Sequence, residues 1–203
     1  FDSNSNKIVI AYADTADSNK GKALVGTVNS SNNSISFGSA TIFETGNTQQ
    51  ISNVSFDSNS NRVVVAYNDA GNSNRGTAVV GSVSGTSISF GTPVVFENAT
   101  TNYLTTTFDS NSNKVIIAYS NGGDSGYGTA IVGTVDSSDN SISFGTKTVF
   151  ESADTAGTNA TFDSSSNKVL VSYIDQGNSI YGTSVVGTVS GTSISFGSAV
   201  LFK

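Results

Sequence analysis

Three tyrosines, Tyr103, Tyr127 and Tyr181, stand in polar segments of the chain: NATTNY, NGGDSGYG and DQGNSIYG. An aromatic ring can stack on the C–H face of a sugar, while amide and carboxylate side chains bond the sugar hydroxyls. These residue types therefore predict a carbohydrate-binding surface. The alternative role for each tyrosine is packing at the end of a strand. The candidate ligand-binding residues are Tyr103, Tyr127, Tyr181, Asp69, Asn72, Arg75, Asn102, Asn121, Asp124, Asp175 and Asn178.

The chain also contains strings that resemble the start of a calcium-binding loop, such as Asp57-Ser-Asn-Ser-Asn. An EF-hand loop needs Gly at its sixth position and an acid at its twelfth. Here the sixth residue is a cation, Arg62, and the twelfth is never Glu. Asp and Asn also stabilise turns by bonding their own backbone, so the string predicts a turn. The remaining oxygen-rich set is Asp14, Asp69 and Asp175, but no metal and no cofactor is expected.

Catalysis is not predicted. A glycosidase needs two neighbouring carboxylates, and Glu44, Glu97 and Glu151 occupy one repeated position, each able to neighbour a loop Asp. A residue copied into every repeat is more typical of a strand end than of a single active centre. A sialidase-type site needs several arginines, and only Arg62 and Arg75 exist. A glycoside hydrolase is therefore the disfavoured alternative.

The composition excludes other classes of function. The chain has 9 Lys and Arg against 15 Asp and Glu, a formal charge of −6, which does not suit binding to a phosphate backbone. Cys and His are absent, which removes disulfides, thiolate sites and Ser–His catalysis. No apolar run is long enough for a membrane span. We expect neither nucleic-acid binding nor membrane insertion.

An internal repeat organises the chain. The string Phe-Asp-Ser-(Asn/Ser)-Ser-Asn-(Lys/Arg) begins at Phe1, Phe56, Phe108 and Phe162. We therefore predict a single domain, 1–203, built from repeats 1–44, 45–97, 98–151 and 152–203.

Each repeat predicts four short antiparallel strands, because runs of Val, Ile, Phe, Tyr and Thr are bounded by Gly, Asn, Asp and Ser. In the third repeat the strands are expected at Asn102–Asp109, Lys114–Ser120, Gly128–Asp136 and Ser141–Glu151. The second strand is apolar without alternation, so both of its faces should be buried. Gly145 is expected to kink the fourth strand, and Pro93 is expected in the fourth strand of its repeat, at the sheet edge. Four-stranded sheets buried on both faces predict an all-β fold, a β-propeller of four blades.

Two loops vary between the repeats while the tight turns stay constant. The variable loops follow the second and fourth strands, so hairpin geometry places them on one side. Variable loops on a rigid scaffold are where binding usually resides. The first blade is incomplete, because Phe1-Asp2 matches only the end of a first strand. A closed four-bladed ring and a fragment of a longer array both remain open.

At the level of architecture, the repeat array resembles the sialidase-like and lectin propellers of secreted and virion proteins. The Asp-box Ser-x-Asp-x-Gly-x-x-Trp of that family is missing, since the chain contains no Trp. No functional residue is therefore carried over. The variable loops repeated on one face, together with the low charge density and the absence of redox-sensitive residues, predict a multivalent, non-catalytic module that binds glycans or a cell-surface receptor, within an extracellular or virion adhesin. A structural spacer in a fibre or larger propeller is the alternative.

Overall fold

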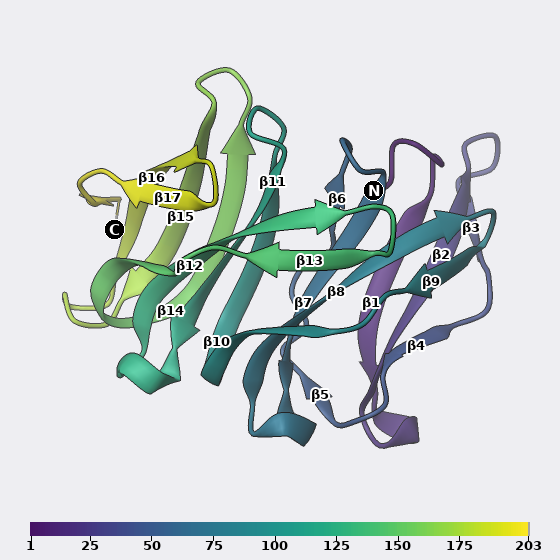
Figure 1. Ribbon diagram of the computed structural model, residues 1–203, viewed down its shortest axis with the longest axis horizontal. Coiled ribbons are helices and arrows are strands. Elements are labelled where there is room, and N and C mark those ends of the chain that lie inside the picture. Colours follow the sequence, from purple (N-terminus) through teal and green to yellow (C-terminus); the bar gives the residue numbers. More distant parts are fainter. Residues whose placement is uncertain (203) are drawn as a thin grey trace.

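The computed structural model describes residues 1–202, and these form an all-β, antiparallel fold (Figure 1). The strands are β1 (Ile8–Asp14), β2 (Lys20–Asn29), β3 (Ser34–Phe37), β4 (Thr41–Glu44), β5 (Thr48–Gln49), β6 (Ser55–Asp57), β7 (Arg62–Asp69), β8 (Arg75–Ser84), β9 (Ser87–Phe90), β10 (Val94–Asp109), β11 (Lys114–Asn121), β12 (Tyr127–Asp136), β13 (Ser141–Phe144), β14 (Thr148–Asp163), β15 (Lys168–Asp175), β16 (Tyr181–Ser190), β17 (Ser193–Phe196) and β18 (Val200–Leu201). Helix is confined to the 3-10 turns η1 (Thr15–Asp17), η2 (Ala70–Asn72) and η3 (Gly122–Asp124). None of these could cross a membrane.

The third repeat shows how each unit is built. β11 and β12 match the predicted second and third strands to within one residue. The fourth strand is divided, because β13 pairs with the end of β12 and the start of β14 pairs with its beginning. The strand is interrupted between Phe144 and Thr148, at the position where the kink was predicted, and the Gly145 N–H still donates to the Val132 carbonyl oxygen at 2.9 Å. Pro93 lies in the equivalent break before β10, exposed and outside the strands, which corrects its expected place in a strand.

The repeats are joined by shared strands, which the sequence did not predict. β10 pairs with β8 through its first half and with β11 through its second half. β14 connects the third and fourth repeats in the same way. As a result, one sheet of fourteen strands runs through the second, third and fourth repeats, and β1–β4 form a separate sheet.

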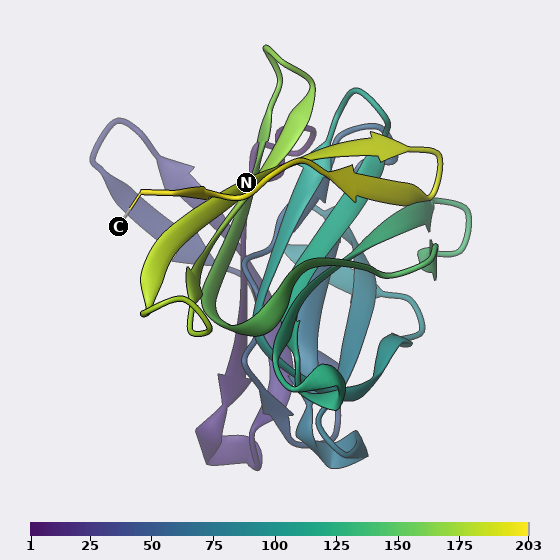
Figure 2. The same ribbon diagram turned by 90° about the vertical axis from the view of Figure 1, so that its left-hand side faces the viewer.

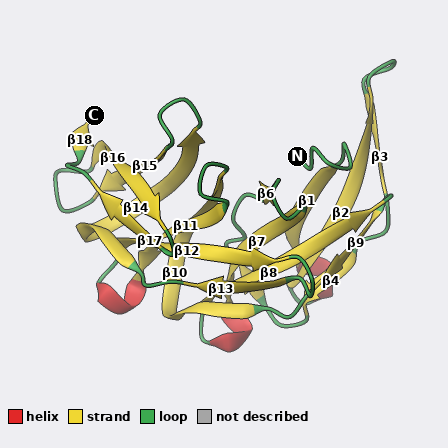
Figure 3. Ribbon diagram, turned by 45° about the horizontal axis from the view of Figure 1, so that its top comes forward, coloured by secondary structure: helices red, strands yellow, loops and turns green. Residues whose placement is uncertain are grey.

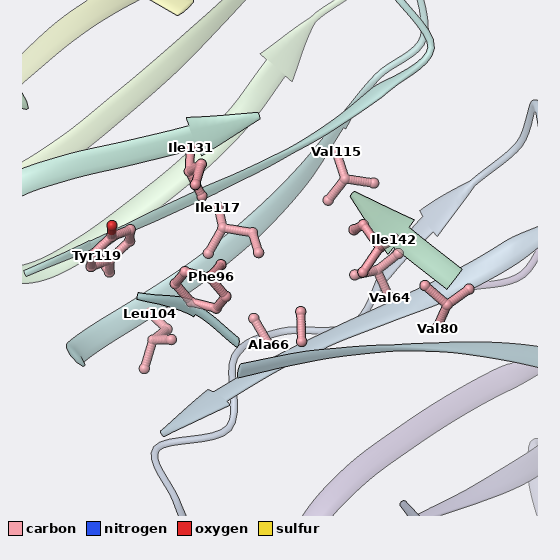
Figure 4. Close-up of a cluster of buried hydrophobic side chains, with 11 residues drawn as sticks. Val64, Ala66, Val80, Phe96, Leu104, Val115, Ile117, Tyr119, Ile131 and Ile142 are labelled. Carbon is pink, nitrogen blue, oxygen red and sulfur yellow. The ribbon is translucent and has the colours of Figure 1, made fainter. Parts of the chain in front are cut away.

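The hydrophobic core lies between the repeats. One cluster joins Val64 and Val80 of the second repeat to Ile117 and Ile131 of the third, with Phe96 among them (Figure 4). Two further clusters join the first repeat to the second and the third to the fourth. From its second residue on, every residue of β7 and β11 is buried. The predicted burial of both faces is therefore confirmed for the two middle repeats.

The first and fourth repeats lie at opposite ends of the molecule (Figures 1 and 3). Figure 2, viewed toward the fourth repeat, places the C-terminal hairpin in front and the first repeat behind. Among residues 1–202 the sheets close into neither a barrel nor a ring. Each terminal repeat therefore keeps one sheet face open.

The tight turns follow the predicted chemistry. Asp57 Oδ1 accepts the backbone N–H groups of Asn59 and Ser60 at 2.9 and 3.0 Å. Asn61, which ends this turn, has a left-handed φ of 54°. Asp109 forms the same turn in the third repeat. The calcium-like strings are therefore turn-forming segments.

Candidate functional site

The variable loops gather on one side of the molecule, where η1–η3 lie along the lower side of Figure 1. Backbone hydrogen bonds join the two kinds of loop. The Gly71 N–H donates to the backbone carbonyl oxygen of Asn47 at 3.0 Å, and the Thr155 N–H donates to that of Gly126 at 2.9 Å. The prediction that both loops emerge together is confirmed. We call this the loop side.

A cavity of about 450 Å³ opens on the loop side where the second, third and fourth repeats meet. It combines one tyrosine ring, three carboxamides, one carboxylate and two serine hydroxyls. The lining residues are Gln50, Asn102, Tyr103, Ser120, Gly122, Ser125, Gly126, Asp154 and Gln176.

One wall of the cavity is a clamp between repeats. The Gln50 Oε1 atom accepts the backbone N–H of Tyr103 at 2.8 Å, and Gln50 Nε2 donates to Asn102 Oδ1 at 3.0 Å. Tyr103 lies in a β-bulge of β10, where the pairing with β11 shifts register. Its side chain is 47% exposed. The clamp therefore holds an exposed ring at the rim of the cavity.

The backbone of Tyr103 is in an unfavourable conformation for a tyrosine. Its φ is 52°, and the equivalent residue of the fourth repeat, Gly157, has a φ of 58°. Left-handed backbone costs an L-residue with a side chain about 1–2 kcal/mol, and glycine avoids this cost. The third repeat thus carries a ring where glycine would be less strained, and such outliers often mark functional positions.

A second wall of the cavity is held by hydrogen bonds to the main chain. Ser120 Oγ donates to the Gly126 carbonyl oxygen at 3.2 Å. The backbone N–H of Gln176 donates to the backbone carbonyl oxygen of Asp154 at 2.9 Å. The Asp154 carboxylate packs directly against Gly126, at a point where a Cβ on residue 126 would overlap it. This wall presents the carboxylate of Asp154 and the carboxamide of Gln176.

Of the predicted ligand-binding residues, the structure brings Asn102 and Tyr103 together in the cavity. Tyr127 and Tyr181 begin β12 and β16 outside it, as the backbone pairing partners of Asn121 and Asp175. Tyr127 is half-buried, whereas Tyr181 is exposed. Tyr127 and Tyr181 therefore do not line the cavity with Tyr103.

Asn121 and Asp124 belong to a hydrogen-bonded cluster. Asn121 is fully buried, and its Nδ2 donates to Asp124 Oδ2 at 2.8 Å and to Glu97 Oε2 at 3.2 Å. Lys147 Nζ lies 2.9 Å from Glu97 Oε2, and that hydrogen bond raises the pKa of Lys147. Glu97 also accepts the hydroxyl of Tyr119 at 3.1 Å. These groups satisfy one another across the junction between the second and third repeats.

The same tyrosine–glutamate contact recurs at the other junctions between repeats. Tyr67 donates to Glu44, and Tyr173 donates to Glu151, each at 3.0 Å. The three tyrosines are buried, and desolvation raises the pKa of each hydroxyl. The repeated glutamate is thus the acceptor for a buried tyrosine at the end of a strand.

The remaining predicted residues form local contacts. Arg75 Nη1 donates to Asn72 Oδ1 at 3.2 Å within one loop, and the exposed Asn178 bonds its loop through its backbone. Asp14 pairs with Lys22 at 2.8 Å, while Asp69 and Asp175 are buried in other repeats. Within residues 1–202 no group of three His, Cys, Asp or Glu side chains is placed to hold a metal ion. The oxygen-rich set suggested by the sequence is therefore not assembled.

Asp69 offers a test of buried charge. Desolvation, and then the nearby Glu44 carboxylate, raise the pKa of Asp69 above its ordinary value of 3.8. When the pKa of a carboxyl group is higher in the folded than in the unfolded state, the unfolded state ionises first as the pH rises. The free energy of unfolding therefore falls between the pKa of the unfolded state and that of the folded state. The third repeat carries Asn121 at the equivalent position, and its Oδ1 accepts the Gly123 N–H at 3.0 Å.

We therefore expect Asp69→Asn to raise the thermal unfolding midpoint by a few degrees at about pH 7. We expect the gain to disappear at about pH 3, where Asp69 is protonated in both states. Calorimetry at the two pH values measures the difference. An equal gain at both would assign the effect to the amide group instead of the lost charge.

The Gln50, Asp154 and Gln176 side chains of the cavity were missed by the sequence analysis. They stand in the loops that vary between repeats, which was the available signal. The candidate residues predicted from the sequence were Tyr, Asn, Asp and Arg, so neither glutamine was among them. A comparison with protein-family models gave no match, and a comparison with curated proteins gave none, so the function is argued from the side chains of the cavity.

Proposed function

We propose that the chain is a non-catalytic binding module whose loop-side cavity takes a neutral carbohydrate, as part of an extracellular or virion adhesin. The observation that carries the proposal is the Tyr103 ring, exposed at the rim of a polar cavity and held on left-handed backbone. A sugar presents an apolar C–H face and several hydroxyls. An aromatic ring beside carboxamides matches both.

The charge of the cavity selects the class of sugar. Within residues 1–202 no Lys or Arg lines the cavity, and Asp154 supplies a carboxylate. An acidic sugar would place its own carboxylate near Asp154 with no cation to compensate it. A neutral glycan avoids this repulsion, because a carboxylate readily accepts hydrogen bonds from sugar hydroxyls.

We also propose that the four repeats are blades of a propeller-like array, similar in architecture to lectin propellers. The support is the core, which lies between successive repeats in three equivalent clusters. The described cavity draws side chains from three successive repeats, so it is not a site repeated in each blade. Multivalent binding would then come from several chains on one surface, where weak sites gain avidity.

A Tyr103→Gly variant tests the carbohydrate proposal. It removes the ring and also relieves the left-handed strain, so the free energy of unfolding should change by less than about 1 kcal/mol. Binding to neutral oligosaccharides on a glycan array should fall at least tenfold. Tyr181→Ala, which removes an exposed ring outside the cavity, should leave binding unchanged.

Three results would count against the proposal, the third against its charge argument. Equal losses in the Tyr103 and Tyr181 variants would place binding elsewhere on the loop side. Absence of binding to any neutral glycan by the native chain would leave the spacer function. Preference for sialylated over neutral glycans would contradict the charge argument alone.

A further inference from the structure

The open sheet faces at the two ends of the molecule carry exposed apolar side chains. On the fourth repeat, Leu170, Val186 and Phe202 are exposed. On the first repeat, Ile10 and Phe37 are exposed. Exposed apolar patches at the ends of a repeat array are typical sites of association.

These two faces are the two halves of a contact that the chain already makes three times. Leu170 and Val186 occupy the positions of Ile116 and Val132, which are fully buried between the third and fourth repeats. On the other side, Ile10 occupies the position of Val65, which is fully buried between the first and second repeats. The open face of the fourth repeat therefore corresponds to the side of a repeat that contacts the following repeat, and we call it the forward face. The open face of the first repeat corresponds to the side that contacts the preceding repeat, and we call it the receiving face.

Aromatic contacts show the same complementarity. Phe150 packs between two rings of the following repeat, Tyr173 at 5.2 Å and Phe196 at 5.5 Å between centroids. Phe43 and Phe96 make the same pair of contacts at the other junctions. Phe202 is the next member of this series and is 61% exposed. The ring pair that would receive it, Tyr12 and Phe37, stands on the open face of the first repeat.

The junction between the second and third repeats adds a polar contact. Arg62 of the second repeat donates to Asn140 Oδ1 and to the Ser137 carbonyl oxygen in the third. The fourth repeat carries Lys168 at the position of Arg62, and the first repeat carries Asn33 at the position of Asn140. The cation Lys168 at one end of the molecule and the amide acceptor Asn33 at the other are therefore the two partners of this contact.

We propose that the open face of the fourth repeat docks onto the open face of the first repeat of a second copy, head to tail. Within one chain the two faces lie at opposite ends, so they do not meet (Figure 3). Contact between two identical faces would place Phe202 against Phe202 and leave the Tyr12–Phe37 pair uncovered. A head-to-tail contact is heterologous, so it closes into a ring or continues as a chain, depending on the rotation between copies.

The association should be weaker than the internal junctions. Ser172 and Ser184 stand on the open face of the fourth repeat, where the third repeat has the fully buried Ala118 and Ala130. Burying two hydroxyls in place of two methyl groups reduces the gain in free energy on association. We therefore expect reversible association over about 1 µM to 1 mM, the range of weak complexes.

Cross-linking between two single-cysteine variants tests the orientation, and the native chain contains no Cys to interfere. Ser34→Cys, beside Asn33, labels the receiving face, and Ser198→Cys, beside Gly197, labels the forward face. The equivalent positions meet inside the chain, because Asn140 lies against Gly91 and Thr192 against Gly145. A short bis-maleimide linker should join the two variants when they are mixed. Neither variant alone should yield a linked dimer.

Phe202→Ala, added to Ser198→Cys, should reduce the linked product at least tenfold. Ile180→Ala is the matched control, because Ile180 is 70% exposed in a loop of the fourth repeat and should not alter the product. Linkage in Ser34→Cys alone would show association of like faces and overturn the proposal. So would a chain that sediments as a monomer at about 1 mM. Neither outcome depends on a carbohydrate, so failure here is distinguishable from failure of the binding proposal.

Discussion

Replacing Phe96 by alanine is expected to lower the free energy of unfolding by about 3–5 kcal/mol, the usual effect of removing a buried aromatic ring. Phe96 is 9% exposed and lies in the cluster between the second and third repeats. Its ring centroid is 5.3 Å from that of Tyr119 and 5.6 Å from that of Phe144. Because this cluster holds two repeats together, the loss should appear in the cooperative unfolding of the whole chain.

Urea unfolding measures the change as a lower midpoint with an unchanged slope. Phe202→Ala is the matched control, because Phe202 occupies the equivalent position in the fourth repeat and is exposed. At micromolar concentration we expect this variant to unfold within about 0.5 kcal/mol of the native chain. Equal losses in the two variants would show that the junction between the repeats contributes no more than an isolated ring. They would contradict the core described above.

The parts of the fold that were predictable are those encoded by local patterns. The unalternating run Val63–Ala66 indicated a strand buried on both faces, and β7 is such a strand. The Asp57 turn was readable because Asp and Asn stabilise turns through contacts with nearby residues. The continuity of β10 was not readable. The polar segment before Tyr103 looks like a loop, and it becomes strand only by pairing with β8 on one side and β11 on the other.

The candidate site shows the same division. Asn102 and Tyr103 could be chosen from residue type and from their place in a variable loop. Gln50 could not, because it reaches Tyr103 across 53 residues of sequence, through a bulge in a neighbouring repeat. Asp154 and Gln176 join the cavity through contacts between loops of the third and fourth repeats. Residue type suggested the chemistry, but the packing of repeats decided which side chains meet.

Gly145→Ala should destabilise the chain by about 3 kcal/mol, at the upper end of the usual cost of overpacking. A Cβ at Gly145 would overlap the backbone carbonyl oxygen of Thr192 in the next repeat, and backbone cannot move aside as a side chain can. Gly197 is the equivalent residue of the fourth repeat. Its Cβ would meet only the Val186 carbonyl oxygen, at 3.8 Å, an ordinary contact.

The two glycines share one local geometry, which makes the comparison between their alanine variants sharp. The N–H of Gly145 donates to Val132 at 2.9 Å, and that of Gly197 donates to Val186 at 3.0 Å. Alanine restricts the unfolded chain equally at both positions, a gain of about 0.4–1 kcal/mol where the backbone is compatible. At micromolar concentration Gly197→Ala should therefore be neutral or slightly stabilising in calorimetry, while Gly145→Ala unfolds several degrees lower. Similar midpoints for the two variants would mean that successive repeats do not approach as closely at this break as the structure places them.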